Sequence, residues 1–507
     1  MIRAGLDHCV KCTICETVCP VAAVTPLFPG PKYCGPQGER FRAGEPVDRG
    51  LDYCSSCGIC TLACPQGVPI AELNSRARAE LRAGQIPLRD RLIVQTVLLG
   101  RLMTPVAPLA NTMLRLRAVR VLLDRVLGIA RDAPLPIAQP QSFPAWLRHH
   151  RPPDSPRTRG TIVFFHGCAG GYFEARASIH TVEVLEHLGF EVFVPRQGCC
   201  GLAQQSNGLF DQARFSVRRL ARQLCRGGRE PIIVTSAGSC AGMLKHEAHR
   251  VLGVDDPAVL DVGARLRDTS EFLMELADAG ELPMSFVPLP LRVSYHAPCQ
   301  VKAQGMGMPA LRLLGLIPGL EVIESGQACC GMAGTYGLKT DRFEIAQAVG
   351  RPLFDMVLAM GAELVACDTE TCRWQITRAT GVPASAGSPG QPVPGGTGES
   401  KNRPVSGCAS LTAPIVARPR RLDGRSWCRG PRPPRTDGAG GPSARGGARA
   451  GGRGGGTHAA GGRGDRLTRG ELADLTGRED RVLVLRAQDD ADRGVGGVGV
   501  LIDPDGD

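Results

Sequence analysis

The chain has 507 residues, enough for about three domains of ordinary size, and 43% of them are apolar, so it can bury large cores. Its formal net charge of +11 comes from one segment, 401–469, which holds 15 Lys and Arg against three Asp; nucleic-acid binding is therefore excluded as a property of the whole protein. The 21 cysteines, with no apolar secretory segment visible at the N-terminus, favour metal or redox chemistry over secreted disulfides.

Two cysteine quartets open the chain. They are Cys9, Cys12, Cys15 and Cys19, and Cys54, Cys57, Cys60 and Cys64. Both follow the spacing C-x2-C-x2-C-x3-C-P of ferredoxins with two [4Fe–4S] clusters, in which the fourth cysteine of each run binds the other cluster. One cluster is therefore expected on Cys9, Cys12, Cys15 and Cys64, and the other on Cys54, Cys57, Cys60 and Cys19. Two zinc knots are the alternative, but zinc sites usually pair two C-x2-C units at longer spacing.

The insert between the quartets, about 34 residues long, is expected to form an irregular surface loop, and Cys34 within it has no assigned role. Residues 70–83 then predict a helix. From 89 to 129 the chain is rich in Leu, Val and Arg. Its apolar runs are shorter than the ~18 residues of a spanning helix, so we expect it not to cross a bilayer. Two interpretations remain: helices on an anionic membrane surface, or helices packed on the body of the protein or on a partner subunit.

Between Cys168 and Cys372 the sequence contains a repeat whose matching cysteines are 130 to 132 residues apart. Each copy has one cysteine, then Cys-Cys-Gly, then another cysteine. The repeat cysteines are Cys168, Cys199, Cys200 and Cys240 in the first copy and Cys299, Cys329, Cys330 and Cys372 in the second. We call the two copies the first and second CCG domains after this motif. Four thiols brought to one place in each copy indicate metal binding, since iron favours thiolate ligands.

Short apolar strands alternate with amphipathic helices around these cysteines, which predicts two tandem α/β domains with parallel sheets. Strands are expected at 161–165, 191–194, 231–235, 292–295, 321–323 and 364–366, and helices at 178–188, 211–225, 310–316 and 343–359. The cysteines fall where strands end, and such sheets bind ligands beyond the carboxyl ends of their strands.

Gly201 and Gly331 allow the backbone to approach closely behind each cysteine pair. Buried, inert cysteine is the alternative for isolated residues, but the repetition of four aligned cysteines disfavours it. His166 and His296 recur beside the first cysteine of each copy, where a hydrogen bond to a cluster sulfur suits them better than direct ligation. Outside the aligned set lie Cys225 and Cys367.

Four motifs of the second copy carry a family resemblance: Tyr295–Cys299, Cys329–Gly337, Ala348–Phe354 and Thr369–Ile376. With these and the two quartets, residues 1–385 resemble the cysteine-rich (CCG) iron–sulfur proteins. That group includes the B subunit of heterodisulfide reductase and the glycolate oxidase iron–sulfur subunit, and the chain is most similar to the family of the C subunit of anaerobic glycerol-3-phosphate dehydrogenase. The full group pattern ends each domain with Cys-x-x-Cys, whereas this chain has Ala237 and Thr369 at the first of those positions.

The resemblance implies an electron-transfer subunit of a respiratory dehydrogenase. It implies two [4Fe–4S] clusters, with one or two further iron–sulfur clusters in the CCG domains. Electrons would come from flavin-containing dehydrogenase subunits and go to membrane quinone, with the chain attached peripherally to the cytoplasmic face of the cell membrane. This favours the membrane interpretation of residues 89–129.

Other functions remain open: a glycolate or lactate oxidase iron–sulfur subunit, a heterodisulfide-reductase-like enzyme acting at a CCG cluster, or a zinc-binding scaffold. No G-x-G-x-x-G fingerprint follows a strand, so a flavin or nicotinamide site, and hence a dehydrogenase active site of its own, is not expected.

The predicted organisation has five parts. They are a small α+β ferredoxin-like domain (1–85), an amphipathic helical linker (86–158), two α/β CCG domains (159–285 and 286–385) and a low-complexity tail (386–507). Residues 386–465 of the tail are rich in Gly, Pro and Arg and cannot bury enough surface to fold, so we expect a disordered tail. Because the resemblance stops inside the second CCG domain, we expect a reading-frame change near residue 385. Residues 480–485 could form a strand.

Overall fold

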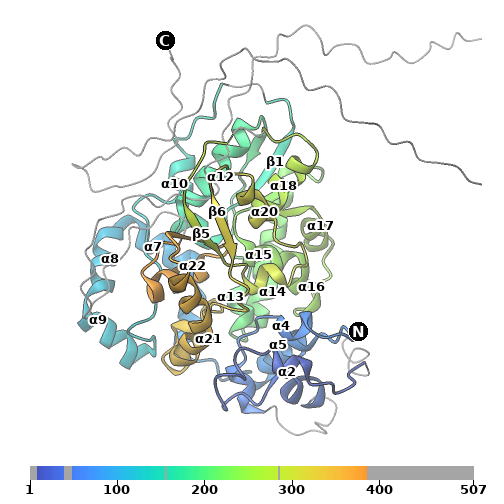
Figure 1. Cartoon of the computed structure of the whole chain (residues 1–507), viewed down its shortest axis with the longest axis vertical. Helices are drawn as coiled ribbons and strands as arrows, with labels where there is room; N and C mark the ends of the chain where they lie inside the picture. The colour runs from blue at the N-terminus through green and yellow to red at the C-terminus, as the bar shows by residue number, and fades with distance from the viewer. Residues whose placement is uncertain (1–7, 39–47, 155–156, 284–285, 385–507) are drawn as a thin grey trace, which may run out of the picture. The chain divides into compact units, whose positions relative to one another are not determined.

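The computed structural model describes residues 8–38, 48–154, 157–283 and 286–384 (Figure 1). The predicted tail, its strand at 480–485 and the expected reading-frame change near residue 385 lie outside these residues. Within them the predicted fold class is confirmed: a small cysteine-rich region and a helical linker precede two α/β units with parallel sheets.

The described part of the N-terminal region consists of helices and turns, so the β part of the expected α+β domain is not found among its described residues. Its elements are α2 (Ile14–Thr17), η1 (Tyr33–Gln37), η2 (Arg49–Tyr53), α4 (Ile59–Leu62) and α5 (Ile70–Leu81). The helix expected at 70–83 is confirmed as α5. The expectation of a surface loop between the quartets is wrong in part, because Val21, Phe28 and Leu51 are buried. A region this small has to use its insert to fill a core.

The linker is a series of short helices. They are α6 (Leu88–Ile93), α7 (Thr96–Met103), η3 (Thr104–Val106), α8 (Ala107–Arg115), α9 (Arg117–Leu122), η4 (Leu123–Leu127) and α10 (Phe143–Leu147). Pro105 and Pro108 stand within the first two positions of η3 and α8. A proline is tolerated there because the first amides of a helix have no intrahelical partner. The two prolines therefore do not end the helical run from α7 to α8.

The first CCG domain contains a four-stranded parallel sheet with the order β2-β1-β3-β4. The strands are β1 (Thr161–Phe165), β2 (Glu191–Phe193), β3 (Ile233–Thr235) and β4 (Leu266–Asp268). The helices are α11 (Gly167–Tyr172), α12 (Ala175–His187), α13 (Leu202–Ser206), α14 (Phe210–Leu224), η5 (Cys225–Gly227), α15 (Gly238–Gly242), η6 (Met243–Glu247), α16 (Ala248–Arg250), α17 (Pro257–Arg265) and α18 (Thr269–Asp278).

The second CCG domain contains a three-stranded parallel sheet with the order β6-β5-β7. The strands are β5 (Arg292–Tyr295), β6 (Glu321–Glu324) and β7 (Leu364–Ala366). The helices are α19 (Cys299–Lys302), α20 (Pro309–Gly315), η7 (Tyr336–Leu338), α21 (Thr340–Ala359) and α22 (Glu370–Thr380). In each domain the first strand lies in the interior of the sheet, so the loops after it and after its neighbours meet at one edge.

Alternate residues of the central strands pack into different cores. Val163 and Ile233 pack with α14, α15 and α17, whereas Ile162 and Val234 pack with α12 and α18. Successive strand residues point to opposite faces of a sheet, so helices cover both faces, which explains why β1 is apolar almost throughout. Leu313 of α20 joins the core on the α12 side, so the two CCG domains share it.

Most of the expected elements are confirmed. The strands at 161–165, 292–295 and 364–366 match residue for residue, and the four helices begin and end within three residues of their expected bounds. Strand β4 has no counterpart among the expected strands, because Leu266–Asp268 contains two charged residues among three and has no apolar run.

Candidate metal centres

The two N-terminal cysteine loops have the same unusual backbone. Lys11 and Thr13 have φ of 61° and 68° in the first loop, and Ser56 and Gly58 have φ of 56° and 81° at the matching positions of the second. A left-handed backbone is strained in residues other than glycine. Its repetition indicates that both loops need this curled shape, which turns their cysteines toward one side.

Two cavities collect the eight cysteines of the quartets. One is lined by Cys9, Cys12, Cys15 and Cys64, and the other by Cys19, Cys54, Cys57 and Cys60. The fourth cysteine of each run thus lies with the first three of the other run, which is the grouping expected from the spacing.

The second of these cavities suits thiolates that bind a cation. The N–H of Ala22 donates to Sγ of Cys19 and the N–H of Ser56 to Sγ of Cys54, both at 3.5 Å. Such bonds favour the thiolate, but burial raises the pKa of Cys19 to about 11. A bound metal would supply the positive charge that four buried thiolates require, so the residues present fit an iron–sulfur cluster.

The first CCG domain brings its four repeat cysteines together. Cys168 lies on α11, Cys199 and Cys200 precede α13, and Cys240 lies on α15. The Sγ atoms of Cys200 and Cys240 are 3.2 Å apart, and Cys199 interacts with Cys168 and Cys200. The interaction with Cys199, together with burial, raises the pKa of Cys168 well above its ordinary value. The four thiols therefore form one continuous group.

The second CCG domain repeats this arrangement. Cys299 begins α19, Cys329 and Cys330 follow β6, and Cys372 lies on α22. Cys329 interacts with Cys299 and Cys330, and Cys330 with Cys372. Hydrogen bonds from Cys299 and Cys330 lower the pKa of Cys329 well below its ordinary value. The four thiols of the second domain therefore also form one continuous group.

The glycine after each cysteine pair is required by the backbone. Gly201 and Gly331 have φ of 88° and 85°. A Cβ on Gly201 would lie 2.9 Å from the carbonyl oxygen of Ala213 on α14, and one on Gly331 would lie 1.9 Å from that of Ala346 on α21. The N–H of each glycine also donates to Sγ of the first cysteine of its pair, at 3.4 and 3.3 Å. The glycine thus allows the close approach of the helix behind it and also holds the first thiol of the pair through a hydrogen bond.

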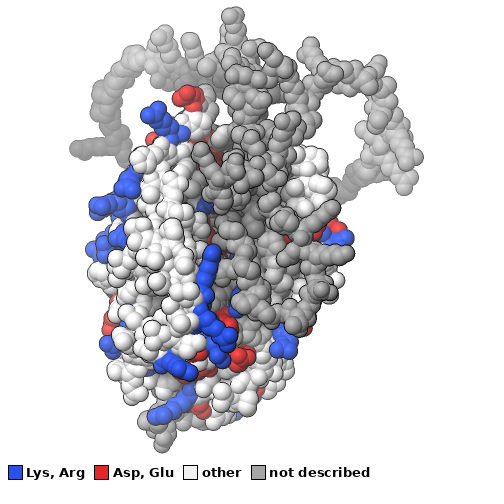
Figure 2. Space-filling model, turned by 90° about the vertical axis from the view of Figure 1, so that its left-hand side faces the viewer, with Lys and Arg blue, Asp and Glu red and all other residues white. Residues whose placement is uncertain are grey.

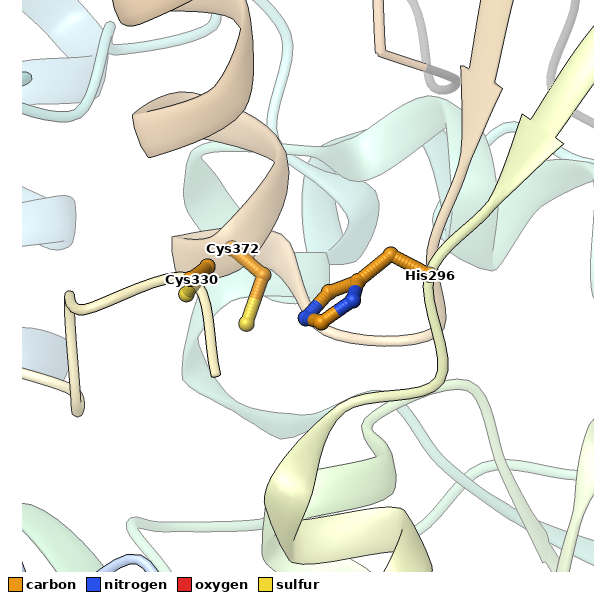
Figure 3. A group of neighbouring side chains, drawn as sticks. All are labelled: His296, Cys330 and Cys372. Atoms are coloured by element: carbon orange, nitrogen blue, oxygen red, sulfur yellow. The ribbon is translucent and has the colours of Figure 1, made fainter. Parts of the chain in front are cut away.

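His296 adds a nitrogen to the second site (Figure 3). A ligand atom of His296 and the Sγ atoms of Cys330 and Cys372 all lie within 4.8 Å of one another. Within the described part of the chain, this is the one such trio of His, Cys, Asp or Glu. Burial lowers the pKa of His296 to about 4, so its imidazole is neutral.

Among the described residues, three further cysteines lie outside the two quartets and the two CCG sets. Cys225 follows the last residue of α14, and its thiol lies 3.8 Å from a carboxylate oxygen of Asp261. Cys367 interacts with Cys372. Cys34 is buried in the N-terminal core, and burial raises its pKa to about 12.

The second N-terminal site and the second CCG site share one buried cluster. Cys57, Cys299 and Cys329 are all buried in it. Burial and then the charge of Cys329 raise the pKa of Cys57. Because these thiols affect one another's ionisation, the two sites are neighbours.

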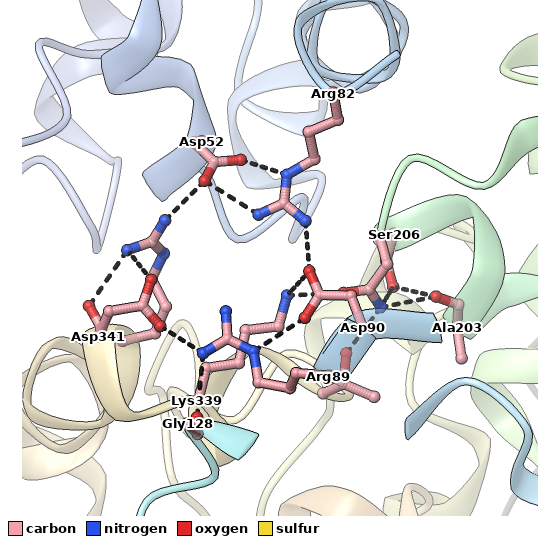
Figure 4. A network of polar contacts seen from close by, with 12 residues as sticks. Asp52, Arg82, Arg89, Asp90, Gly128, Ala203, Ser206, Lys339 and Asp341 are labelled. Carbon is pink, nitrogen blue, oxygen red and sulfur yellow. Dashed lines mark hydrogen bonds and ion pairs between the residues drawn. The ribbon is translucent and has the colours of Figure 1, made fainter. Parts of the chain in front are cut away.

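A buried ion-pair network holds these regions together (Figure 4). Asp90 is fully buried and pairs with Arg82 at 2.6 Å, Lys339 at 2.9 Å and Arg89 at 3.0 Å. Burial opposes the ionisation of Asp90, but Lys339, Arg82 and Arg89 outweigh it and lower its pKa. Arg82 ends α5 and Lys339 precedes α21, so these four residues, the Asp90 network, join the N-terminal region to the second CCG domain.

The two CCG domains meet where each carries its last repeat cysteine. The Oγ of Ser239 lies 3.3 Å from Oγ1 of Thr369, and Nε2 of Gln304 donates to the carbonyl of Gly238 at 2.9 Å. Ser239 adjoins Cys240 in the sequence. The edges that bear the thiols therefore face each other.

Helices α7 to η4 carry apolar side chains on their outer side. They are Leu98, Leu102, Val106, Leu109, Met113, Leu116, Leu122 and Val126, each 46–69% exposed. We call this set the apolar face. Figure 2 views the side on which α8 and α9 lie and shows a broad white surface with Lys and Arg along its borders.

The same helices are also tied to the body of the protein. Gly100 lies against Tyr172, whose ring a Cβ would meet at 2.5 Å, and the side chain of Asn111 makes two hydrogen bonds with the backbone of Ala138, at 2.9 and 3.0 Å. By length and composition alone, Thr96–Arg115 could cross a membrane. The expectation that no segment is long enough is therefore wrong, because the prolines in η3 and α8 do not end the helical run.

The Asp90 network and the surroundings of His296 are features that sequence reasoning does not find. Asp90 and Lys339 are 249 positions apart, and a single sequence contains no signal that pairs residues at such a distance. The one hint is an acidic residue that stands among the arginines of the amphipathic linker.

Known proteins and domain families resemble this chain. The 4Fe-4S dicluster domain family matches residues 5–68, and the cysteine-rich domain family matches 162–245 and 293–377. The chain is 38% identical over 388 residues to the C subunit of anaerobic glycerol-3-phosphate dehydrogenase from Escherichia coli K12, a match that covers 75% of this chain and 96% of the relative.

More distant relatives match shorter parts. The identity is 33% over 220 residues with the B subunit of fumarate reductase (CoM/CoB) from Methanothermobacter marburgensis, covering 42% of this chain and 41% of that one. It is 29% over 185 residues with lactate utilization protein A of Oceanobacillus iheyensis, covering 35% and 73%.

Proposed function

Since this chain belongs to the family of the C subunit of anaerobic glycerol-3-phosphate dehydrogenase, we propose that it is an iron–sulfur electron-transfer subunit without a catalytic site of its own. In this role it receives electrons from flavin-containing dehydrogenase subunits and passes them to membrane quinone. The observation that carries the proposal is the shared buried cluster of Cys57, Cys299 and Cys329, which makes a ferredoxin-type site and a CCG site neighbours.

The crossed quartets would hold two [4Fe–4S] clusters, and the CCG cysteines one or two further iron–sulfur clusters. The ligands in the quartets would be Cys9, Cys12, Cys15 and Cys64, and Cys54, Cys57, Cys60 and Cys19. Those in the CCG domains would be Cys168, Cys199, Cys200 and Cys240, and Cys299, Cys329, Cys330 and Cys372. Iron–sulfur centres at these cysteines would supply one-electron transfer.

The contacts between the sites suggest one order. The second N-terminal site borders the second CCG domain, and the two CCG domains meet at Ser239 and Thr369. Thr96, the first residue of α7, lies against Cys168. Cys199 and burial raise the pKa of the Cys168 thiol, and Thr96 lowers it. We expect electrons to enter through the N-terminal region and to leave through the first CCG domain, beside the apolar face.

The apolar face is our candidate for the membrane contact. Exposed leucines bordered by arginines are typical of helices that lie in the interface of an anionic membrane. Because Gly100 and Asn111 tie the same helices to the body, we expect the segment to lie along the cytoplasmic surface of the membrane and not across it.

Quinone oxidation of the reduced protein tests this function. Full-length protein, purified anaerobically and reduced with dithionite, is mixed with a water-soluble naphthoquinone analogue, and the visible absorbance of its iron–sulfur centres is followed. We expect rapid re-oxidation that is lost in Cys200→Ser and Cys330→Ser variants and kept in a Cys225→Ser control. Re-oxidation by an organic disulfide and not by the quinone would instead indicate an enzyme of the heterodisulfide reductase type, and no response to either would contradict the proposal.

A further inference from the structure

His296 is a buried imidazole with one ring nitrogen that has no partner. The residue is fully buried, and its Nε2 makes no hydrogen bond to any described residue. Figure 3 shows the ring with its edge turned to the sulfur of Cys372. A buried polar atom without a partner is unfavourable, so this nitrogen needs a partner in the loaded protein.

The orientation of the ring is fixed from the other side. Nδ1 of His296 lies 3.1 Å from Oγ of Ser325, and this oxygen also accepts a hydrogen bond from the N–H of Gln327 at 3.4 Å. The backbone N–H of His296 donates to the carbonyl of Ala366 at 2.9 Å. When Nδ1–H donates to Ser325, Nε2 of the neutral ring carries the lone pair. Metal-binding histidines are usually oriented in this way by the nitrogen that does not bind.

We propose that Nε2 of His296 is a ligand of the metal centre in the second CCG domain, together with Cys330 and Cys372, and not the donor of the hydrogen bond to a cluster sulfur that the sequence led us to expect. This rests on the proposed function, which places an iron–sulfur centre there. Two sulfurs bound to one ion at about 2.3 Å each lie at most about 4.6 Å apart, so a small movement brings atoms now within 4.8 Å to one ion. The nitrogen supplies the ligand that is missing because Thr369 stands where a cysteine is expected.

The first CCG domain has no equivalent ligand among its described residues. Nδ1 of His166 donates to the carbonyl of Gly167 at 2.6 Å, and its ring packs against Phe143 with 5.1 Å between ring centroids. Its ring forms no trio with described cysteines of the kind that His296 forms. Histidine ligation therefore distinguishes the second domain from the first.

Imidazole in place of thiolate has an electronic consequence. A neutral nitrogen removes one negative charge from the centre, and Rieske centres, in which histidines replace cysteines, have higher potentials than all-cysteine clusters. The second CCG centre is therefore expected to be easier to reduce than one with cysteine at position 296, which suits a site that takes electrons from a neighbouring ferredoxin-type cluster.

Pulsed EPR on the full-length protein, purified anaerobically, tests the assignment. We expect the strong 14N coupling of a directly bonded nitrogen in the unmodified protein, its loss in His296→Gln, and its persistence in the matched variant His166→Gln. In His296→Cys we expect the centre to remain and its midpoint potential to fall. The 14N coupling in the unmodified protein alone shows whether a nitrogen is bonded to the centre. The test therefore does not depend on the folding of a variant.

The outcomes also separate this proposal from the function. A centre that is lost in Cys330→Ser but has no bonded nitrogen would overturn His296 ligation and leave the electron-transfer function intact. If Cys367→Ser then removed the centre, Cys367 would be the missing ligand. Iron content and EPR that do not change in Cys330→Ser would mean that the second domain holds no centre, which would overturn His296 ligation, and the same result in Cys200→Ser as well would overturn the proposed path through the CCG domains.

Discussion

The two CCG domains have the same four cysteines on the same strand ends but differ in what surrounds them. The second domain shares a buried cluster with the N-terminal Cys57 and has the free nitrogen of His296 beside its thiols. The first adjoins the linker through Thr96 and Cys168 and has its histidine turned to a backbone carbonyl. The two domains can therefore take two different places in one electron-transfer path although they have the same cysteines. Their neighbours differ: the second domain adjoins the N-terminal region and the first adjoins the linker.

The largest expected effect is on the glycine of each cysteine pair. In Gly331→Ala the new Cβ would overlap the Ala346 carbonyl at 1.9 Å in a left-handed backbone, so we expect a loss of about 5 kcal/mol of stability. In Gly201→Ala the approach to Ala213 is 2.9 Å, and we expect a loss of about 2 kcal/mol. Thermal unfolding followed by circular dichroism measures both.

Gly305→Ala is the matched control for this pair. Its φ is 70°, but no described atom lies within 4 Å of the added Cβ, so backbone strain of about 1 kcal/mol is all that we expect. Equal losses in all three variants would mean that the close approach of the helix behind the cysteine pair is unimportant.

The Asp90 network should strengthen the attachment of the N-terminal region to the second CCG domain, in addition to their shared buried cluster. Asp90→Ala leaves Arg82, Arg89 and Lys339 without their buried carboxylate, which should cost about 3 kcal/mol. We expect limited proteolysis to cut between the two regions more rapidly in this variant. Asp341→Ala, at a half-exposed partner of Arg89, should change stability by less than about 1 kcal/mol. An intact resistance to proteolysis in Asp90→Ala would contradict this role.

The apolar face should matter for membranes and not for the metal centres. Leu102 and Leu109 are 63% and 59% exposed, and each leucine that is removed from water contributes roughly 1.5 kcal/mol or more, a factor of about 10 in affinity. We expect the change of both leucines to glutamate to weaken binding to anionic phospholipid vesicles by about 100-fold in co-sedimentation, with unchanged iron content. Phe215→Glu, an exposed apolar residue on α14, is the control, and equal loss of binding in it would argue against a specific face.

The smallest effect is expected at Cys225, one of the cysteines outside the aligned sets. Cys225→Ser removes a thiol whose neighbour is the carboxylate of Asp261, so iron content and EPR spectra should not change. A lost signal in this variant would show that the four aligned cysteines of the first domain do not hold a centre alone.

A single sequence predicts the features whose pattern lies within a short stretch of residues or repeats along the chain. It does not predict those that depend on contacts between distant segments. The strands β1 and β7 are predictable because buried parallel strands are short apolar runs. Strand β5 contains Arg292 and Ser294, and it is predictable, like the four cysteines per domain, because it belongs to the repeat. Strand β4 is not, because Leu266–Asp268 is mostly charged and only its partner β3 makes it a strand. The Ser325 bond that turns the His296 nitrogen to the site, and the pairing of Asp90 with Lys339, depend on contacts between distant segments.

The most direct measurement is the iron and labile-sulfide content of the anaerobically purified full-length protein, with EPR of the reduced protein and of its Cys200→Ser and Cys330→Ser variants. Two [4Fe–4S] clusters account for about eight irons per chain. We predict clearly more iron than this, and the loss of a separate signal in at least the Cys330→Ser variant, while the signals of the ferredoxin-type clusters remain. About eight irons and unchanged spectra in both variants would contradict a path through the CCG domains, and zinc in place of iron would contradict electron transfer altogether.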